Sequence, residues 1–203
     1  LWNNSWWADP ALLGRYPEDG LLLYGADVPK FTDAEMSTIH QPLDFYGVNI
    51  YQGDKVRAGK DGAPEHLPFA PGFPRTLFAW AVTPESLEWG PRFLYERYKT
   101  PIVITENGMS NVDWVMEDGA VRDPQRIDFL RRYLQAYRRA IDAGVDARGY
   151  FTWSLLDNFE WAEGYKHRFG LVYVDYETQK RTPKDSAAWY REVIRSNGAS
   201  LGA

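Results

Sequence analysis

A carboxylate at the end of an apolar run is the first residue whose type and position suggest chemistry. Residues 102–105 are apolar or β-branched, and Glu106, Asn107 and Gly108 follow directly. A buried parallel strand has no polar face, so its first charged residue is expected where the strand leaves the sheet. In parallel α/β folds, catalytic groups collect at that end of the strands. Glu106 is therefore a candidate catalytic residue, although a carboxylate that caps the next loop or pairs with a surface base would fit the same pattern.

Two further segments end in side chains suited to a site. Residues 43–51 predict a strand that ends at Asn49 and Tyr51. Residues 148–155 predict another strand, almost wholly apolar, which leads into the aromatic and acidic run 153–161. Together with the run described above, the sequence offers three strand ends that carry polar or aromatic groups.

Helix signals separate these strands. Residues 83–98 begin with a Thr-Pro-Glu pattern typical of a helix start, and residues 182–195 begin with Thr-Pro-Lys-Asp. Residues 123–143 have the clearest helical periodicity, with apolar side chains at steps of three and four: Ile127, Leu130, Leu134, Tyr137 and Ile141. The order strand, helix, strand, helix, strand, helix predicts parallel strands joined by right-handed crossovers.

The remaining segments predict short helices and one long loop. We expect a helix over residues 10–13, and another that begins at the capping-box pattern Thr32-Asp33-Ala34-Glu35 and ends near residue 39. Residues 53–75 are rich in Gly and Pro, and a loop of that length usually carries function or is disordered.

Composition excludes several classes of function. The 203-residue chain has a formal net charge of −5 and no apolar window of membrane-spanning length, so neither a nucleic-acid nor a membrane partner is expected. It has no cysteine, which excludes thiol catalysis and disulfides and agrees with a cytoplasmic protein. His40, His66 and His167 lie far apart in sequence, so we expect no metal or other cofactor. Lys166, His167 and Arg168 are expected to form a solvated basic patch.

Several short segments carry a stronger signal than any single pattern. They are Trp7-Ala8-Asp9-Pro10, Gly14-Arg15-Tyr16-Pro17, Asp44-Phe45-Tyr46-Gly47-Val48-Asn49-Ile50-Tyr51, Ile104-Thr105-Glu106-Asn107-Gly108, the run from Trp153 to Trp161, and the run from Arg168 to Asp175. In this order and spacing they resemble glycoside hydrolase family 1, the β-glucosidases and their relatives. A lone Thr-Glu-Asn-Gly would be weak evidence, but separate motifs in register tie almost the whole of residues 1–203 to a single domain of this family.

The resemblance implies a fold and a reaction. The fold is a (β/α)8 TIM barrel, of which this chain supplies about the last three strand–helix units. The reaction is that of a retaining glycosidase, in which one carboxylate attacks the anomeric carbon and another, about 5–5.5 Å away, protonates the leaving oxygen. Glu106 matches the family nucleophile, and Tyr51 matches a tyrosine that donates its hydroxyl to that carboxylate. Without the Glu106 motif beside it, Tyr51 would be interpreted as a core tyrosine.

The resemblance also implies a set of substrate-binding residues: Asn49, Trp80, Trp153, Glu160, Trp161 and Phe169. Trp153 would offer the sugar C–H groups a flat apolar face, and Asn49 would order the polar floor. Glu160 and the Trp161 indole would bind the outer hydroxyls, because a carboxylate can accept two of them. Trp80 matches a tryptophan on the aglycone side. Trp153 could instead fill the barrel core, and Trp80 and Phe169 could serve in packing.

One family motif is absent from the chain. The acid/base glutamate of the family lies in a Thr-x-Asn-Glu-Pro motif at the fourth strand, and no Asn-Glu-Pro occurs here. The early Gln, His and Asn residues that bind the glycone are missing too. Three strands alone would leave open sheet edges and an uncovered inner face. We therefore expect a C-terminal part of a family enzyme, whose partner is an N-terminal half of the same barrel that carries the acid/base glutamate.

The sequence leaves two classes of function open. The first is a retaining β-glucosidase that acts on a small-molecule β-glycoside or oligosaccharide and accepts related glycones such as galactose or fucose. Glu160 and Trp161 favour a free 6-hydroxyl over a 6-phosphate in that reading. The second is a catalytically incomplete half-barrel that acts as a binding module, by self-association or by complementing an N-terminal chain.

Overall fold

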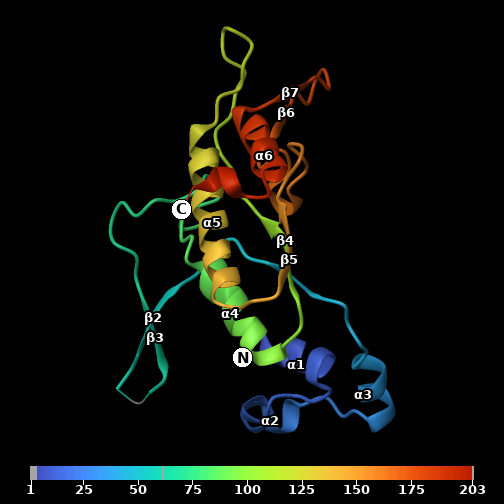
Figure 1. Cartoon of the computed structure of the whole chain (residues 1–203). Coiled ribbons are helices and arrows are strands. Elements are labelled where there is room, and N and C mark those ends of the chain that lie inside the picture. Colours follow the sequence, from blue (N-terminus) through green and yellow to red (C-terminus); the bar gives the residue numbers. More distant parts are fainter. Residues whose placement is uncertain (1–3, 61, 203) are drawn as a thin grey trace.

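A parallel three-stranded sheet occupies the centre of the structure (Figure 1). The computed structural model describes residues 4–60 and 62–202. The strand order is β1 (Tyr46–Asn49), β4 (Ile102–Asn107) and β5 (Ala147–Thr152), and both neighbouring pairs are parallel. The predicted alternation of parallel strands and helices is confirmed, although β1 and β5 are shorter than the apolar segments from which they were expected.

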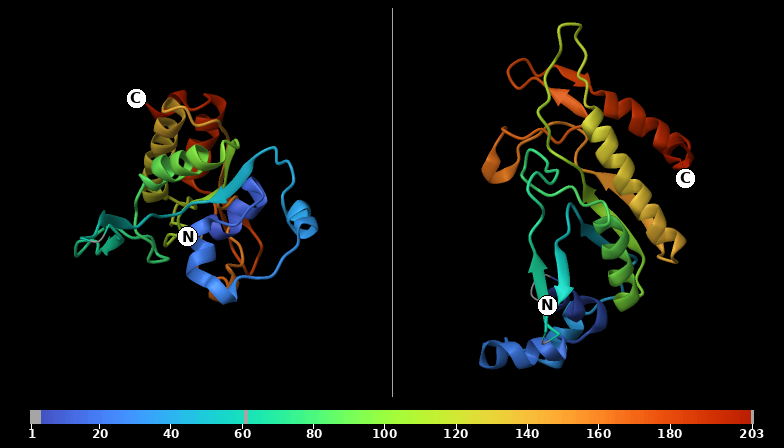
Figure 2. Two further views of the ribbon diagram at one scale, coloured as in Figure 1. Left: turned by 90° about the horizontal axis from the view of Figure 1, so that it is seen from below. Right: turned by 90° about the vertical axis from the view of Figure 1, so that its left-hand side faces the viewer.

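Three helices cover one face of this sheet (Figure 2). They are α4 (Ser86–Tyr98), α5 (Pro124–Asp142) and α6 (Asp185–Arg195), close to the predicted ranges. Ile102 and Ile104 of β4 are fully buried against the apolar stripe of α5, which includes Phe129, Leu130, Tyr133, Ala136 and Tyr137. Each large side chain buried in this way contributes roughly 1.5–3 kcal/mol, so this face holds the core.

The opposite face of the sheet is open. Gly47, Val103 and Gly149 are register partners across the three strands and lie on this face. Thr105 was expected to be buried with the rest of its strand, but it is exposed because it also lies on this side. Phe151 is 62% exposed there. Among the described residues, no strand pairs with the outer edges of β1 and β5.

Short helices near the N-terminal end lie below the sheet in the view of Figure 1. They are α1 (Ser5–Leu13), α2 (Glu18–Tyr24), the 3-10 turn η1 (Gly25–Asp27) and α3 (Asp33–Ile39). The capping box of α3 is confirmed, since Thr32 and Glu35 exchange hydrogen bonds between their side chains and backbone N–H groups.

Helix α1 is longer than predicted, and α2 was not predicted. Pro10 lies inside α1, where it removes one helical hydrogen bond. The ring of Trp6 lies 4.6 Å from those of Tyr16 and Tyr24, which ties α1 to the segment that follows it. This packing helps to stabilise a helix that contains a proline. The residues involved are ten and eighteen positions apart, so the periodicity of a short segment does not reveal the contact.

The long loop also contains regular structure. It folds in part into the antiparallel hairpin β2 (Lys55–Ala58) and β3 (Pro64–Leu67), which projects from the body of the molecule (Figure 1). The remaining elements are the 3-10 turn η2 (Trp161–Glu163), the hairpin β6 (Val172–Val174) and β7 (Arg181–Pro183), and the 3-10 turn η3 (Ala199–Leu201). None of the helices in the described part of the chain has the length and apolarity needed to cross a bilayer.

Candidate active site

The ends of β1 and β4 bring the two predicted catalytic residues into contact. The Tyr51 hydroxyl donates to Glu106 Oε2 at 2.7 Å. The Tyr51 carbonyl accepts from the hydroxyl of Tyr133 on α5 at 3.1 Å, and the Ile50 N–H donates to the Glu106 carbonyl at 3.1 Å. The predicted hydrogen bond between Tyr51 and Glu106 is therefore present, and both of its residues are tied to the surrounding fold.

The electrostatics of Tyr51 connect a second carboxylate to this pair. Burial raises the pKa of the Tyr51 hydroxyl, and the hydrogen bond to Glu106 and the charges of Glu106 and Glu160 raise it further. The hydroxyl therefore stays protonated at neutral pH and acts as a donor. Since the charges of Glu106 and Glu160 both act on Tyr51, these two carboxylates lie within electrostatic reach of the same hydroxyl.

Asn107 and Gly108 join the ends of all three strands. The buried Asn107 side chain donates to the Ile50 carbonyl at 2.8 Å and accepts from the Tyr150 hydroxyl at 2.6 Å. Its backbone carbonyl accepts from the Trp153 N–H at 2.8 Å. A Cβ at Gly108 would lie 1.9 Å from the Trp153 carbonyl oxygen, so only glycine allows this approach. The sequence drew attention to both residues only because they follow the carboxylate.

Aromatic rings pack beside Tyr51. The ring of Trp80 lies 4.7 Å from that of Tyr51, and the ring of Phe169 lies 6.4 Å from it. Phe78 contacts Trp80 at 4.4 Å and Phe169 at 5.7 Å between ring centroids. We call Phe78, Trp80 and Phe169 the aromatic wall. It unites two of the predicted residues with Phe78, which the sequence did not single out.

The other predicted binding residues occupy different settings. Trp153 Nε1 donates to Glu160 Oε2 at 3.2 Å, which orients that carboxylate. Asn49 Oδ1 accepts from the Thr105 hydroxyl at 2.6 Å, on the open face of the sheet. Trp161 is the first residue of η2, directly after Glu160, and is 80% exposed, so its indole is not packed against the aromatic wall.

The expectation of a solvated basic patch at residues 166–168 is wrong for two of the three residues. Lys166 is exposed as predicted. His167 is buried, and its Nδ1 lies 3.0 Å from Ser110 Oγ. Arg168 donates to Asp157 Oδ2 at 2.6 Å. Three consecutive basic residues look alike in sequence, and only the fold reveals which of them meet a buried partner.

A set of buried charges that the sequence did not indicate joins the loops after β4 and β5 to the starts of α5 and α6. Lys184 Nζ donates to Asp113 Oδ2 at 2.6 Å and to Asp157 Oδ1 at 2.8 Å, with all three side chains fully buried. The charge network comprises residues from the loops after β4 and β5 and from the starts of α5 and α6: Asp113, Asp123, Arg126, Asp157, Arg168 and Lys184. It balances three negative against three positive charges and anchors the loop that carries Trp153 and Glu160.

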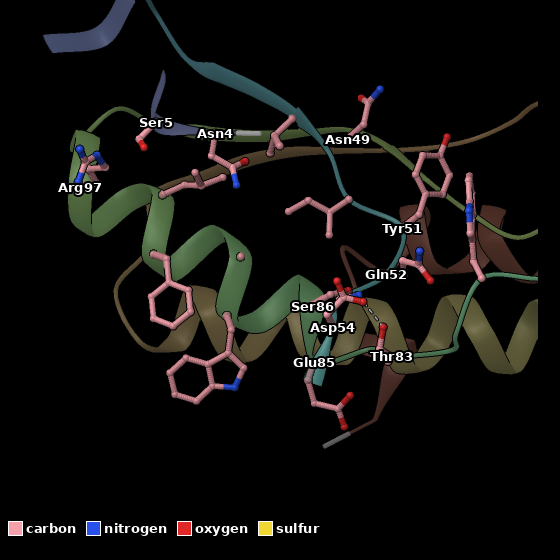
Figure 3. A pocket seen from close by; sticks show the side chains of 18 of the residues that line it. Asn4, Ser5, Asn49, Tyr51, Gln52, Asp54, Thr83, Glu85, Ser86 and Arg97 are labelled. Carbon is pink, nitrogen blue, oxygen red and sulfur yellow. Dashed lines mark hydrogen bonds between the residues drawn. The ribbon is translucent and has the colours of Figure 1, made fainter. Parts of the chain in front are cut away.

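A cavity of 780 Å³ runs along the outer edge of β1 beside α4 (Figure 3). Three predicted site residues, Asn49, Tyr51 and Trp80, are among its lining residues. Its apolar lining also includes Val48, Ile50, Trp89, Phe93 and Leu94. Glu106 and Glu160 are not among its lining residues, so it is a groove that borders the candidate sugar site without including the two carboxylates. Within residues 4–60 and 62–202, no group of three or more His, Asp or Glu side chains is arranged to hold a metal ion.

Comparison with known proteins decides the family. A sequence model of the family described as "Glycosyl hydrolase family 1" matches residues 1–199. The chain belongs to glycosyl hydrolase family 1. "Beta-glucosidase A" of Thermotoga maritima is 44% identical over 97% of this chain, and the "1,4-beta-D-glucan glucohydrolase" of Thermotoga neapolitana is 43% identical over 97%. A "Bifunctional beta-D-glucosidase/beta-D-fucosidase" of Bifidobacterium breve is 41% identical over 98%.

A solved member of glycosyl hydrolase family 1 shows the same arrangement. The β-glucosidase of Thermotoga maritima in complex with glucoimidazole matches with a TM-score of 0.85 at 42% identity, over 96% of this chain and 44% of that chain. The predicted fold class is confirmed, since the three strands and their helices form part of the family's (β/α)8 barrel. The chain spans 44% of the length of each Thermotoga relative and 48% of the Bifidobacterium one. The roles expected of individual site residues stay predictions.

Proposed function

We propose that this chain supplies the nucleophile-bearing part of a retaining β-glucosidase, with Glu106 as the nucleophile. The 2.7 Å hydrogen bond from Tyr51 to Glu106 Oε2 carries the proposal. A nucleophilic carboxylate must be ionised and must keep one orientation toward the anomeric carbon. A phenol that stays protonated and donates to one carboxylate oxygen fixes the rotamer and leaves the other oxygen for the attack.

The reaction has two displacements. Glu106 attacks the anomeric carbon, the bond to the leaving oxygen breaks, and a carboxylic acid from outside this chain protonates that oxygen. The product is an ester between the sugar and Glu106. The same outside carboxylate then takes a proton from water, the water oxygen attacks the anomeric carbon, and Glu106 leaves with the configuration retained. Tyr51 keeps its proton throughout.

A β-D-glucosyl residue is the proposed non-reducing end of the substrate. The relatives are named as β-glucosidases, a glucan glucohydrolase and a bifunctional β-D-glucosidase/β-D-fucosidase, which supports a glucose-like glycone. Glu160 can accept two sugar hydroxyls, and its hydrogen bond from Trp153 Nε1 presets the carboxylate for them. A carboxylate at this place would repel a 6-phosphate, so a free 6-hydroxyl is the preferred substituent.

The acid/base glutamate is proposed to come from an N-terminal part of the same barrel. The chain has no Asn-Glu-Pro motif, and its relatives are more than twice as long as the part it matches. The outer edges of β1 and β5, the open face of the sheet and the groove beside α4 are the surfaces that such a partner would cover. The same open surfaces favour a second candidate function, a binding module that associates without catalysis.

Covalent trapping tests the nucleophile. The chain, alone and mixed with the N-terminal part of a family 1 barrel, is incubated with 2,4-dinitrophenyl 2-deoxy-2-fluoro-β-glucoside and weighed intact. This leaving group departs without protonation, and the fluorine slows hydrolysis of the ester. We expect a mass gain of one glycosyl unit that Glu106→Gln abolishes and the exposed-site control Glu117→Gln retains. Folded protein that stays unlabelled in both samples would reject the proposal in favour of the binding module.

A further inference from the structure

A serine, a histidine and a glutamate line up outside the proposed catalytic pair. Ser110 Oγ lies 3.0 Å from His167 Nδ1, and His167 Nε2 lies 3.4 Å from Glu163 Oε2. Such a set can activate a serine nucleophile in hydrolases. Here Ser110 is fully buried, so no substrate can reach its hydroxyl. The arrangement therefore has to be explained by what it holds together.

The three residues belong to the segments that carry the site. Ser110 lies in the loop that follows Glu106 at the end of β4. Glu163 lies in η2, shortly after Glu160, and His167 precedes Phe169 in the same loop. The Leu77 N–H also donates to the Ser110 carbonyl at 3.2 Å, so the segment that carries Trp80 joins the same point.

His167 touches the aromatic wall directly. Its ring lies 4.6 Å from Phe78, which contacts Trp80 at 4.4 Å, and Trp80 in turn lies 4.7 Å from Tyr51. A buried imidazole is costly unless its nitrogens are paired, and here both face a polar partner. Those two partners fix the plane of the ring, and the ring sets where Phe78 packs.

We propose that His167 is a positioning residue that holds the aromatic wall against Tyr51 and thereby sets the preference of the site for flat, aromatic aglycones. This rests on the proposed function and on the aglycone-side position that the family resemblance implies for Trp80. The contacts of His167 are with Ser110, Glu163 and Phe78, so it acts on the site through Phe78 and Trp80. Its loss therefore affects the aglycone end of the site and spares the glycone end.

The first test needs no sugar. The indole N–H signal of Trp80 is followed by ¹H–¹⁵N NMR in the 203-residue chain and assigned with Trp80→Phe; the signal of Trp189, on α6, is assigned in the same way as a reference. We expect His167→Leu to shift the Trp80 signal and leave Trp189 in place, and His167→Asn, which can still bond Ser110, to restore much of the shift. His66→Leu, at an exposed histidine, is the matched control. An unmoved Trp80 signal would overturn the proposal.

A double variant guards against loss of folding. His167→Leu leaves the Ser110 hydroxyl buried without its partner, whereas Ser110→Ala/His167→Leu removes both polar groups together. Equal shifts of Trp80 and Trp189 in this double variant would mean a general loosening and would also overturn the proposal.

The second test measures binding in the complex with the N-terminal part of a family barrel. Dissociation constants are compared for glucoimidazole and for a phenyl-substituted glucoimidazole, which adds an aromatic aglycone mimic. We expect His167→Leu to weaken the phenyl-substituted compound roughly threefold to tenfold and to leave glucoimidazole within about twofold. Equal loss for both compounds would contradict the proposal. If the complex that carries no His167 substitution binds neither compound, the proposed function fails. The NMR signal of Trp80 then decides by itself whether His167 positions the aromatic wall.

Discussion

At the scale of single residues, the hydrogen bond between Tyr51 and Glu106 is the feature on which the proposed chemistry depends. It joins side chains from two neighbouring strands at 2.7 Å, and the Tyr51 backbone is held in turn by Tyr133 of α5. The bond does not supply the nucleophile. Its contribution is to keep the carboxylate in one rotamer.

Tyr51→Phe should therefore slow covalent trapping without unfolding the chain. A hydrogen bond to a charged group contributes about 1.5–3 kcal/mol, which corresponds to roughly a 10- to 100-fold lower rate of mass gain with the fluoro-glucoside. Tyr165→Phe, at an exposed tyrosine, is the control and should keep the parent rate. A Tyr51→Phe variant that is labelled as fast as the parent would show that Glu106 needs no such support.

The sequence predicts site residues well where a motif fixes their position and poorly where a partner is distant. Glu106 and Tyr51 were identified from their places at strand ends and from a family resemblance. His167 and Arg168 were expected in a solvated patch, because the sequence around them does not indicate that they pair with Ser110 and Asp157. Burial of a polar group depends on a partner that only the fold supplies.

At the scale of elements, the charge network joins the starts of α5 and α6 to the loops after β4 and β5. Lys184 directly precedes α6 and donates to Asp113 and Asp157 in two different loops. Asp157 also accepts from the Gly170 N–H at 2.9 Å, which fixes the return of the loop that carries Glu160. The helices thus position the site through buried ion pairs as well as through apolar packing.

Removing the central cation should be strongly destabilising. Lys184→Met leaves two buried carboxylates short of a partner, and breaking a buried ion pair in this way costs about 3–5 kcal/mol. Urea unfolding monitored by circular dichroism should show a large drop in the midpoint. Lys180→Met removes an exposed lysine and should change the midpoint little. Equal midpoints for the two variants would mean that the network carries no net stability.

The network should also make the chain sensitive to acid. Burial raises the pKa of the Asp113 carboxyl, but the charges and hydrogen bonds of Arg126 and Lys184 outweigh burial and hold that pKa below its usual value. Above about pH 4 the carboxyl is ionised in both the folded and unfolded states, and its full stabilisation is present. As the pH falls further, the unfolded state takes up a proton first, so the free energy of unfolding decreases.

Urea midpoints between pH 6 and pH 3 test this expectation. The parent chain should lose stability steeply below about pH 4, and Asp113→Asn should be less stable at pH 6 but flatter over the acid range. Asp128→Asn alters an exposed pair with Arg132 and should keep the steep parent profile. Parallel profiles for the parent and Asp113→Asn would assign the acid sensitivity to other carboxyls.

Local patterns were enough for the long helices but not for the irregular parts. The apolar spacing of α5 predicted its range, because one face of it packs on the sheet. Ile141 fits the same spacing yet is exposed in the last turn of α5, beside the fully buried Ala140. The hairpin of β2 and β3 was not predicted. Its strands are exposed on both faces, so no buried apolar side marks them in the sequence.

At the scale of the whole molecule, one face of the central sheet and its two outer edges are uncovered among the described residues. One face of the sheet is covered by helices, while the other presents exposed side chains such as Thr105 and Phe151. The outer edge of β1 lies beside a groove of 780 Å³ with apolar side chains in its lining. The sequence predicted these open surfaces from the number of strands, since three strands cannot close a barrel.

We expect the N-terminal part of a family 1 barrel to bind this chain through those surfaces. Mixing the two should raise the midpoint of thermal unfolding in a concentration-dependent way, because a partner that binds only the folded state stabilises it by mass action. Phe151→Lys places a charge on the open face, where the partner would bury it, and should weaken the complex by at least roughly tenfold. Val56→Lys adds the same charge on the projecting hairpin β2, at a side chain of similar exposure, and should leave the affinity unchanged. Equal affinities for the two variants would place the partner elsewhere on the molecule, and a midpoint unaffected by mixing would favour the chain as a self-contained binding module.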